Sequence, residues 1–304
     1  MPISQPISGI MVPVVTTFDA TGDALDISGF VANIRAHLAA GLDGIVVAGS
    51  TGEAALLGET ERATLVEHAR AAVPGDRWLI AGIGAESTKL SVERARAAAT
   101  RGADAVLVVA PHYYPESATP AALLGHYTRI ADESPIPVML YSIPKYMHFA
   151  LPASVVCKLA EHPNVIGMKD SAGDAAGLAG FLAAQSPTFS VLTGNGSTLH
   201  AALTAGARGG ILAVAVFAPA LVLALVEAVR AGRDADAAIA QSSLVPLGRD
   251  VVGAYGVPGV KAALDVIGLA GGRVRSPLRP LDASDYRRVA ELVEAAMARS
   301  PVPA

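Results

Sequence analysis

Eight short apolar runs rich in Val and Ile recur along the chain, at residues 10–18, 44–49, 78–83, 105–111, 137–142, 165–170, 189–194 and 209–215. The runs lack polar alternation, which is typical of strands that are covered on both faces. Segments with helical spacing follow them in turn, at about 27–40, 59–72, 88–101, 119–132, 152–161, 174–184, 197–205 and 219–231. Because a strand returns parallel to its neighbour only through a crossover, this alternation predicts a parallel sheet. Eight such units predict a closed (β/α)8 TIM barrel of the α/β class.

The strand pattern stops after residue 231, and the remaining periodic segments are all helical. They lie near 234–251, 258–268 and 283–298. We therefore expect a catalytic barrel domain at residues 1–231 and a C-terminal helical region at residues 232–304.

Composition excludes several classes of protein. Of the 304 residues, 52% are apolar and 16% are charged, which excludes a disordered chain. The net charge is -4 and no Lys/Arg cluster is present, so we expect no nucleic acid as a partner. The single cysteine, Cys157, excludes a disulfide framework and fits a reduced, cytoplasmic setting.

One stretch is apolar enough to be weighed as a membrane span. Gly209 to Val226 carries no charge over eighteen residues. Pro219 divides it into a β-branched run and an Ala/Leu-rich run, which predicts a buried strand followed by a buried helix. Residues 1–10 contain neither a positively charged region nor a long apolar core, so we expect no secretory signal and no membrane partner.

Polar residues gather at the expected carboxyl ends of the strands, where barrels of this kind carry their active sites. These residues are Thr16-Thr17, 49–53 (GSTGE), 111–114 (PHYY), 141–144 (YSIP), 169–171 (KDS) and 194–196 (GNG). They form a shortlist of candidate active-site residues.

Lys169 is the most informative of them, because it ends an apolar segment and is one of only five lysines. A lysine in an apolar barrel loses the hydration of its ammonium form, which favours a neutral amine that attacks a carbonyl carbon and forms a Schiff base. The alternative is a structural ion pair with Asp170 or with another neighbouring residue. Tyr141, which ends the preceding strand, is either the proton carrier for this chemistry or a tyrosine packed at the barrel rim.

The turn at 49–52 offers two hydroxyls and several backbone N–H groups, a pattern that suits a carboxylate or another anion. It lacks the Gly-Lys-Ser/Thr ending of a P-loop, and no Gly-x-Gly-x-x-Gly follows a strand, so no nucleotide cofactor is expected. The glycines at 194–196 and 209–210 suit either a phosphorylated ligand or tight turns. The seven histidines lack metal-ligand spacing, so no metal is expected either.

Taken in order, these strand ends resemble the pyruvate-dependent class I aldolases, the family that includes dihydrodipicolinate synthase and N-acetylneuraminate lyase. The resemblance runs along nearly the whole chain. It is carried by the segments 49–53 (GSTGE), 111–114 (PHYY), 141–144 (YSIP), 167–171 (GMKDS) and 256–261 (GVPGVK).

The resemblance implies a role for each matching residue. Lys169 forms the imine with the 2-oxo acid pyruvate, and Tyr141 shuttles protons. Ser50 and Thr51 hold the pyruvoyl carboxylate, with Ser50 also relaying a proton. Tyr113 reaches into a neighbouring subunit's site, with Tyr114 as the alternative, and the assembly is a homotetramer built as a dimer of dimers. The other substrate-binding positions are Ser171, Gly194, Ile211 and Tyr146.

The expected functional subtype within this family depends on the residue at position 146, which is Tyr146 here. Dihydrodipicolinate synthases that resemble this chain carry an arginine there, which binds the second substrate's carboxylate. Lys145 is the only substitute nearby, and it lacks the bidentate guanidinium. The segments 85–88 (AEST), 134–137 (SPIP) and 162–171 (HPNVIGMKDS) look closer to 4-hydroxy-2-oxoglutarate aldolases, although animal enzymes of that type look to carry asparagine at the position of Thr51.

We therefore expect an aldolase that releases pyruvate or glyoxylate from a short hydroxy-oxo acid of the 4-hydroxy-2-oxoglutarate type. Three alternatives stay open. They are a 4-hydroxy-tetrahydrodipicolinate (dihydrodipicolinate) synthase, a lyase or dehydratase of 2-keto-3-deoxy sugar acids, and a non-catalytic barrel that binds an oxo acid. A barrel that only binds has no need of a buried amine beside a tyrosine, which argues against the last.

Overall fold

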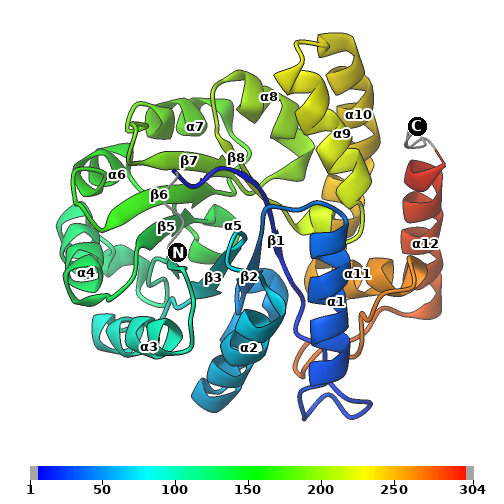
Figure 1. The fold of residues 1–304 in the computed structure, drawn as a ribbon, viewed down its shortest axis with the longest axis horizontal. Coiled ribbons are helices and arrows are strands. Elements are labelled where there is room, and N and C mark those ends of the chain that lie inside the picture. Colours follow the sequence, from blue (N-terminus) through cyan, green and yellow to red (C-terminus); the bar gives the residue numbers. More distant parts are fainter. Residues whose placement is uncertain (1–5, 299–304) are drawn as a thin grey trace.

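The computed structural model describes residues 6–298, in which eight parallel strands form a closed barrel (Figure 1). Each strand pairs with the next along the chain, and the last closes on the first, with Ile211 opposite Met11. The predicted (β/α)8 barrel is confirmed. The strands are β1 (Gly9–Pro13), β2 (Gly44–Val47), β3 (Trp78–Gly82), β4 (Ala105–Val109), β5 (Val138–Ser142), β6 (Val165–Asp170), β7 (Ser190–Thr193) and β8 (Gly209–Ile211).

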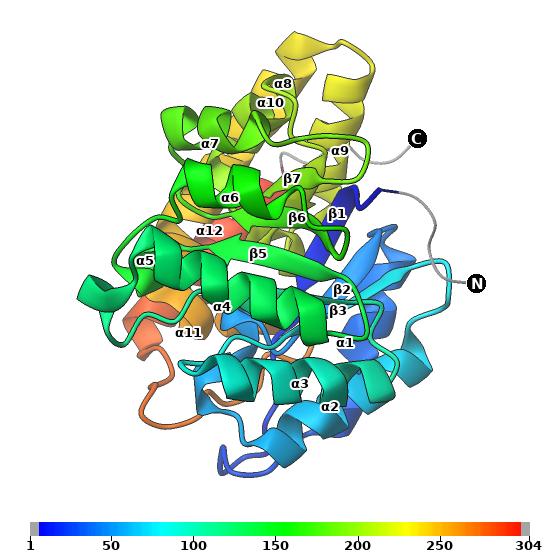
Figure 2. The same cartoon turned by 90° about the vertical axis from the view of Figure 1, so that its left-hand side faces the viewer.

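Helices alternate with the strands and form the outer layer of the barrel, as Figure 2 shows for α2, α3, α4, α6 and α7. Ser87 and Thr119 cap α3 and α4, because each side-chain oxygen accepts a hydrogen bond from an N–H in the first turn. The helices that follow the strands are α1 (Ile27–Ala39), α2 (Glu59–Ala72), α3 (Thr88–Thr100), α4 (Pro120–Glu133), α5 (Pro144–Met147), α6 (Ala153–Leu159), α7 (Ala175–Leu182), α8 (Leu199–Thr204) and α9 (Pro219–Arg230).

The apolar stretch from Gly209 to Val226 divides as expected, but its strand is shorter than the predicted 209–215. Strand β8 ends at Ile211, and a 3-10 helix, η5 (Ala213–Val216), follows before α9 begins at Pro219. Val214 and Val216 are buried in that turn, and an unbroken apolar run does not distinguish a buried turn from a buried strand. None of the helices within residues 6–298 has the length and apolar character needed to cross a membrane.

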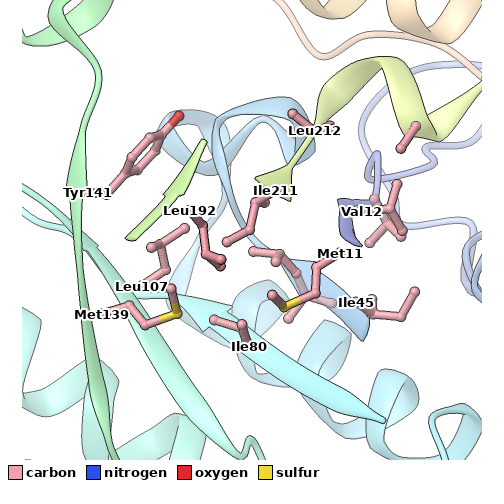
Figure 3. Packing of buried hydrophobic residues seen from close by; sticks show 14 of the residues in the cluster. Met11, Val12, Ile45, Ile80, Leu107, Met139, Tyr141, Leu192, Ile211 and Leu212 are labelled. Carbon is pink, nitrogen blue, oxygen red and sulfur yellow. The ribbon is translucent and has the colours of Figure 1, made fainter. Parts of the chain in front are cut away.

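Apolar side chains from different strands fill the barrel interior. Figure 3 shows Met11, Ile80, Leu107, Met139 and Ile211 gathered there, and each is buried. Side chains alternate between the two faces of a strand, so every second residue points into this core. The rigid interior fixes where the last inward side chain of each strand emerges at the carboxyl end.

Beyond β8 the described chain is helical, with α10 (Asp234–Pro246), the π-helix η6 (Leu247–Gly253), α11 (Ala254–Val266) and α12 (Ala283–Met297). Helix α10 packs on α8 and α9, and α11 packs on the 3-10 helices η1 (Ser50–Gly52) and η5. The segments predicted at 234–251 and 258–268 are nearly continuous, and the chain turns at Gly256, whose φ of 61° and ψ of -139° favour glycine. Residues 1–5 and 299–304 lie outside the described part, so the predictions for both termini fall partly there.

Candidate active site

Lys169 and Tyr141 form a buried pair at the carboxyl ends of β6 and β5. The two residues are opposite each other in the ladder, and Lys169 Nζ donates a hydrogen bond to the Tyr141 hydroxyl at 3.2 Å. The side chains are 6% and 4% exposed. Within residues 6–298, no carboxylate lies within 4.0 Å of the Lys169 amine. The structural ion pair with Asp170 is therefore absent, and the amine keeps a phenol as its partner.

Asp170 follows Lys169 directly, and successive strand residues point to opposite faces. It is 2% exposed, and its carboxylate accepts a hydrogen bond from the Ala172 N–H at 3.2 Å. Burial raises the pKa of Asp170 to about 6. In the described chain, no three His, Cys, Asp or Glu residues gather closely enough to hold a metal ion.

A pocket opens above the Lys169–Tyr141 pair, and seven of the predicted site residues line it. They are Ser50, Thr51, Tyr141, Tyr146, Lys169, Ser171 and Gly194. Two predicted residues lie elsewhere. Ile211 is fully buried in the barrel interior below the pocket, and Tyr113 is 72% exposed at the surface of this chain.

Gly194 leaves room for the Lys169 side chain. A Cβ atom at this position would lie 2.6 Å from Lys169 Cε and would also overlap the Ser171 side chain. The Gly194 N–H donates to the Asp170 carbonyl oxygen at 2.5 Å, which holds the end of β7 against β6. The absence of a side chain at position 194 thus lets Lys169 extend into the pocket.

The turn after β2 carries Ser50 and Thr51 into the pocket on η1. The Thr16 hydroxyl, from the end of the first apolar run, donates to the Gly52 carbonyl oxygen at 2.7 Å. Because Thr16 is buried, this hydrogen bond fixes the turn to the segment that follows β1. The two hydroxyls therefore sit on a fixed backbone, as a carboxylate-binding turn requires.

The sequence did not predict the outer wall of the pocket. It comes from η6 and α11, through Gly248, Val252, Gly253, Gly256, Val257 and Val260. Lys145 joins the opposite rim to this wall, since its Nζ donates to the Gly253 carbonyl oxygen at 2.9 Å. Asn195 also lines the pocket. The only sequence signal for this wall is the 256–261 segment. It contributes to the family resemblance, but the sequence does not indicate where it lies relative to the pocket.

Tyr146 lies at the pocket rim and is 41% exposed. Burial of its inner part raises the pKa of the phenol, so the group is neutral at physiological pH. A neutral phenol donates one hydrogen bond to an anion, whereas the charged guanidinium of an arginine would donate two parallel hydrogen bonds.

Tyr113 and Tyr114 stand together on the loop after β4, with their rings 5.0 Å apart in an edge-on arrangement. The Glu86 carboxylate accepts hydrogen bonds from the His112 and Tyr113 N–H groups, each at 2.9 Å. The loop is therefore held at its base while both phenols are presented to solvent, 72% and 70% exposed.

A closed (β/α)8 barrel that buries a lysine and a tyrosine side by side at its strand ends has the architecture of a class I aldolase, a lyase. The family model for the dihydrodipicolinate synthetase family matches residues 6–296. The chain belongs to this family, which confirms the resemblance drawn from its strand ends.

Individual relatives agree along nearly the whole chain. A 4-hydroxy-tetrahydrodipicolinate synthase from Exiguobacterium sp. is 33% identical and covers 94% of this chain and 97% of its own. An uncharacterized DapA-like lyase from Halobacterium salinarum is 39% identical, over 91% of this chain and 90% of its own. A prophage protein of the dihydrodipicolinic acid synthase family from E. coli K12, solved in complex with pyruvate, is 30% identical with a TM-score of 0.89, covering 96% of this chain and 99% of its own.

Proposed function

We propose that Lys169 forms an imine with pyruvate or the pyruvoyl end of a 2-oxo acid. The amine nitrogen attacks the keto carbon, a carbinolamine forms, and loss of its hydroxyl as water leaves the C=N bond. Tyr141 carries the protons, because its hydroxyl is 3.2 Å from Lys169 Nζ. That contact, inside a pocket which Ser50 and Thr51 also line, is the observation that carries the proposal. The pyruvate complex of the E. coli relative supports it.

The reaction that we propose is cleavage of 4-hydroxy-2-oxoglutarate to pyruvate and glyoxylate. The 4-hydroxyl gives up its proton, the C3–C4 bond breaks, and the electron pair moves into the imine to give an enamine. Protonation of the enamine at C3 and hydrolysis of the imine release pyruvate and restore the amine. Tyr141 is the base and acid nearest Lys169.

Pocket chemistry favours this substrate. Ser171 lies two residues after Lys169 and lines the pocket, which supports a contact of its hydroxyl with the substrate's 4-hydroxyl or far carboxylate. Lys145 supplies the only other cation in the pocket lining, and its amine is held by the Gly253 carbonyl. A point charge at the rim suits a short diacid whose other end is held by the imine.

The second candidate is 4-hydroxy-tetrahydrodipicolinate synthase, in which pyruvate condenses with aspartate semialdehyde. The name of the Exiguobacterium relative favours it. Against it stands Tyr146, because desolvating the semialdehyde's carboxylate beside a neutral phenol is costly without a charged partner.

We also propose that the site is completed by a second copy of this chain. Tyr113 cannot serve its own pocket from its exposed position, but its loop presents the phenol outward, where a neighbouring subunit's pocket can receive it. A homotetramer built as a dimer of dimers would complete every site in this way. The expected partners are the 2-oxo acid and other copies of the chain.

The imine is tested by incubating the protein with pyruvate and reducing with borohydride. One stable adduct is expected, located by peptide mass analysis at Lys169. The variant Lys169→Arg should give none and should lose turnover, because a guanidinium stays protonated and cannot condense. An adduct at Lys145 or Lys158, or no adduct with the wild-type protein, would refute the mechanism.

The substrate is tested by assaying four candidate reactions on one preparation. These are cleavage of 4-hydroxy-2-oxoglutarate, N-acetylneuraminate and 2-keto-3-deoxygluconate, and condensation of pyruvate with aspartate semialdehyde. We expect the first to show the highest kcat/KM, and we expect Tyr146→Arg to raise the condensation by supplying a bidentate partner. If condensation is fastest in the wild-type protein, the synthase replaces the aldolase as the function.

A further inference from the structure

Glu53 and Lys261 form a buried ion pair directly behind the Ser50–Thr51 turn. Lys261 Nζ lies 2.6 Å from Glu53 Oε1, and the two side chains are 2% and 0% exposed. The second carboxylate oxygen of Glu53 accepts from the Arg275 N–H at 2.8 Å, and Lys261 Nζ also donates to the Arg273 carbonyl oxygen at 2.5 Å. The pair thus joins the end of η1 to α11 and to the segment that follows it.

Such a pair is a poor way to stabilise a fold. Removing two charges from water costs more than their attraction often returns, and replacing both partners by apolar groups is frequently neutral or stabilising. Burial lowers the pKa of Lys261, while the nearby Glu53 carboxylate opposes that shift. The chain keeps two charges in its interior at a site where apolar side chains would pack.

Glu53 also sits in a strained backbone conformation. Its φ of 57° and ψ of 35° lie in the left-handed region, which disfavours residues with a side chain. Such outliers persist where surrounding contacts over-determine them, and they concentrate at functional sites. Here the conformation is accompanied by backbone hydrogen bonds of Glu53 with Ser50 and Leu56 and by the contacts that the carboxylate makes with Lys261 and the Arg275 N–H.

The location of the pair shows what it fixes. Ser50 and Thr51 precede Glu53 on the turn, whereas Val257 and Val260 precede Lys261 on α11, and all four line the pocket. The ion pair therefore connects the Ser50–Thr51 turn to the part of the pocket wall that α11 forms. We infer that Glu53 and Lys261 are positioning residues. They hold the Ser50–Thr51 turn in place relative to Lys169, so that the turn can bind the carboxylate of a substrate attached to that lysine. This inference rests on the proposed function.

The test replaces both charges at once, so that neither is left buried and unpaired. The double variant Glu53→Gln with Lys261→Met keeps side-chain volume and removes the ion pair. We expect it to fold, with a thermal midpoint close to that of the wild-type protein. We expect the pyruvate concentration for half-maximal borohydride trapping to rise about tenfold, a loss of about 1.4 kcal/mol. Lys169 should still be trapped at saturating pyruvate.

Glu53→Asp is the second variant, because it keeps both charges but shortens the carboxylate's reach to Lys261 and the Arg275 N–H. It should also raise the pyruvate concentration for half-maximal borohydride trapping, by about threefold or more. Arg70→Met is the matched control. It removes the Arg70–Asp104 ion pair beside the amino end of β4, away from the pocket, so it should alter stability without altering pyruvate dependence.

The outcomes separate the two proposals. An unchanged pyruvate dependence in the folded double variant overturns the positioning role, and an unchanged value in Glu53→Asp overturns it if the double variant does not fold. If Arg70→Met raises the pyruvate concentration for half-maximal trapping as well, the positioning role is also overturned, because a general loss of stability would then explain the effect. If the wild-type protein gives no Lys169 adduct, the proposed function itself fails and the inference fails with it.

Discussion

The substitution Gly194→Ala tests whether the reach of Lys169 depends on the missing side chain beside it. The added methyl carbon would lie 2.6 Å from Lys169 Cε, whereas ordinary contacts lie at 3.4–4 Å. The added carbon would also overlap Ser171 Oγ, so either the Lys169 and Ser171 side chains or the end of β7 must move by about 1 Å to relieve the overlap. The Gly194 N–H donates to the Asp170 carbonyl oxygen on β6, so the strand end is held and the side chains of Lys169 and Ser171 are the parts that move.

A displacement of that size has a calculable consequence for the reaction. Misplacing a reacting group by about 1 Å costs on the order of a hundredfold in rate, which is about 2.7 kcal/mol in the barrier. Overpacking a tight site costs the fold about 1–3 kcal/mol as well. We therefore expect Gly194→Ala to remain folded with a lower thermal midpoint, and to form the pyruvate imine about a hundredfold more slowly.

The rate is measured by stopping pyruvate incubations with borohydride at increasing times and counting the Lys169 adduct by mass. Gly75→Ala is the matched control, because a Cβ at Gly75 meets nothing within 4 Å. It should leave the rate unchanged. If Gly194→Ala is trapped as fast as the wild-type protein, the lysine has other room to extend and the steric argument is wrong.

Three further predictions follow from the site and its surroundings. Tyr113→Phe should lose most turnover while Lys169 is still trapped with pyruvate, and full turnover would assign the relay to Tyr114. Burial lowers the pKa of His37 and of His126 to about 4, so the unfolded chain binds more protons near pH 5. Urea denaturation should show stability falling between pH 6.5 and 4, by up to about 3 kcal/mol per histidine. For Asp170 the sign is opposite, because burial raises its pKa from 3.8 to about 6, so the folded chain binds more protons between these values and stability falls as the pH rises through that window. Asp170→Asn should therefore gain up to about 3 kcal/mol at pH 7 and little at pH 4, and an equal gain at both would contradict the assignment.

The barrel was predictable because its signals are local. Each apolar run needs only its own residues to indicate a doubly covered strand, and eight alternations leave few topologies. The pairing of Lys169 with Tyr141 was predictable for a related reason. Tyr141 lies near the carboxyl end of β5, and Lys169 lies near the carboxyl end of β6, the next strand. Because the carboxyl ends of consecutive parallel strands lie side by side, the two side chains are expected to be neighbours.

The outer wall was not predictable, because it depends on contacts between distant parts of the chain. Residues 248–260 carry few polar side chains, and nothing in their spacing places them over the barrel mouth. The ion pair between Glu53 and Lys261 was missed for the same reason. Helical periodicity shows which face of a helix is buried but not which loop that face meets. The predicted division at residue 231 leaves this part of the pocket wall in the C-terminal region.

The two buried lysines show how surroundings divide one residue type between two roles. Lys261 is 2% exposed and meets a carboxylate and a backbone carbonyl, so its amine is engaged as a charged donor. Lys169 is 6% exposed, donates a hydrogen bond to the Tyr141 phenol and lines the pocket. An amine held by a carboxylate is a structural group, because its donors are occupied and its charge is required. An amine whose hydrogen-bond partner is a phenol fits the nucleophile that we propose for the imine. The Glu53–Lys261 pair therefore lies in the wall of the site, whereas the Lys169–Tyr141 pair lies at its floor, where we propose that the chemistry occurs.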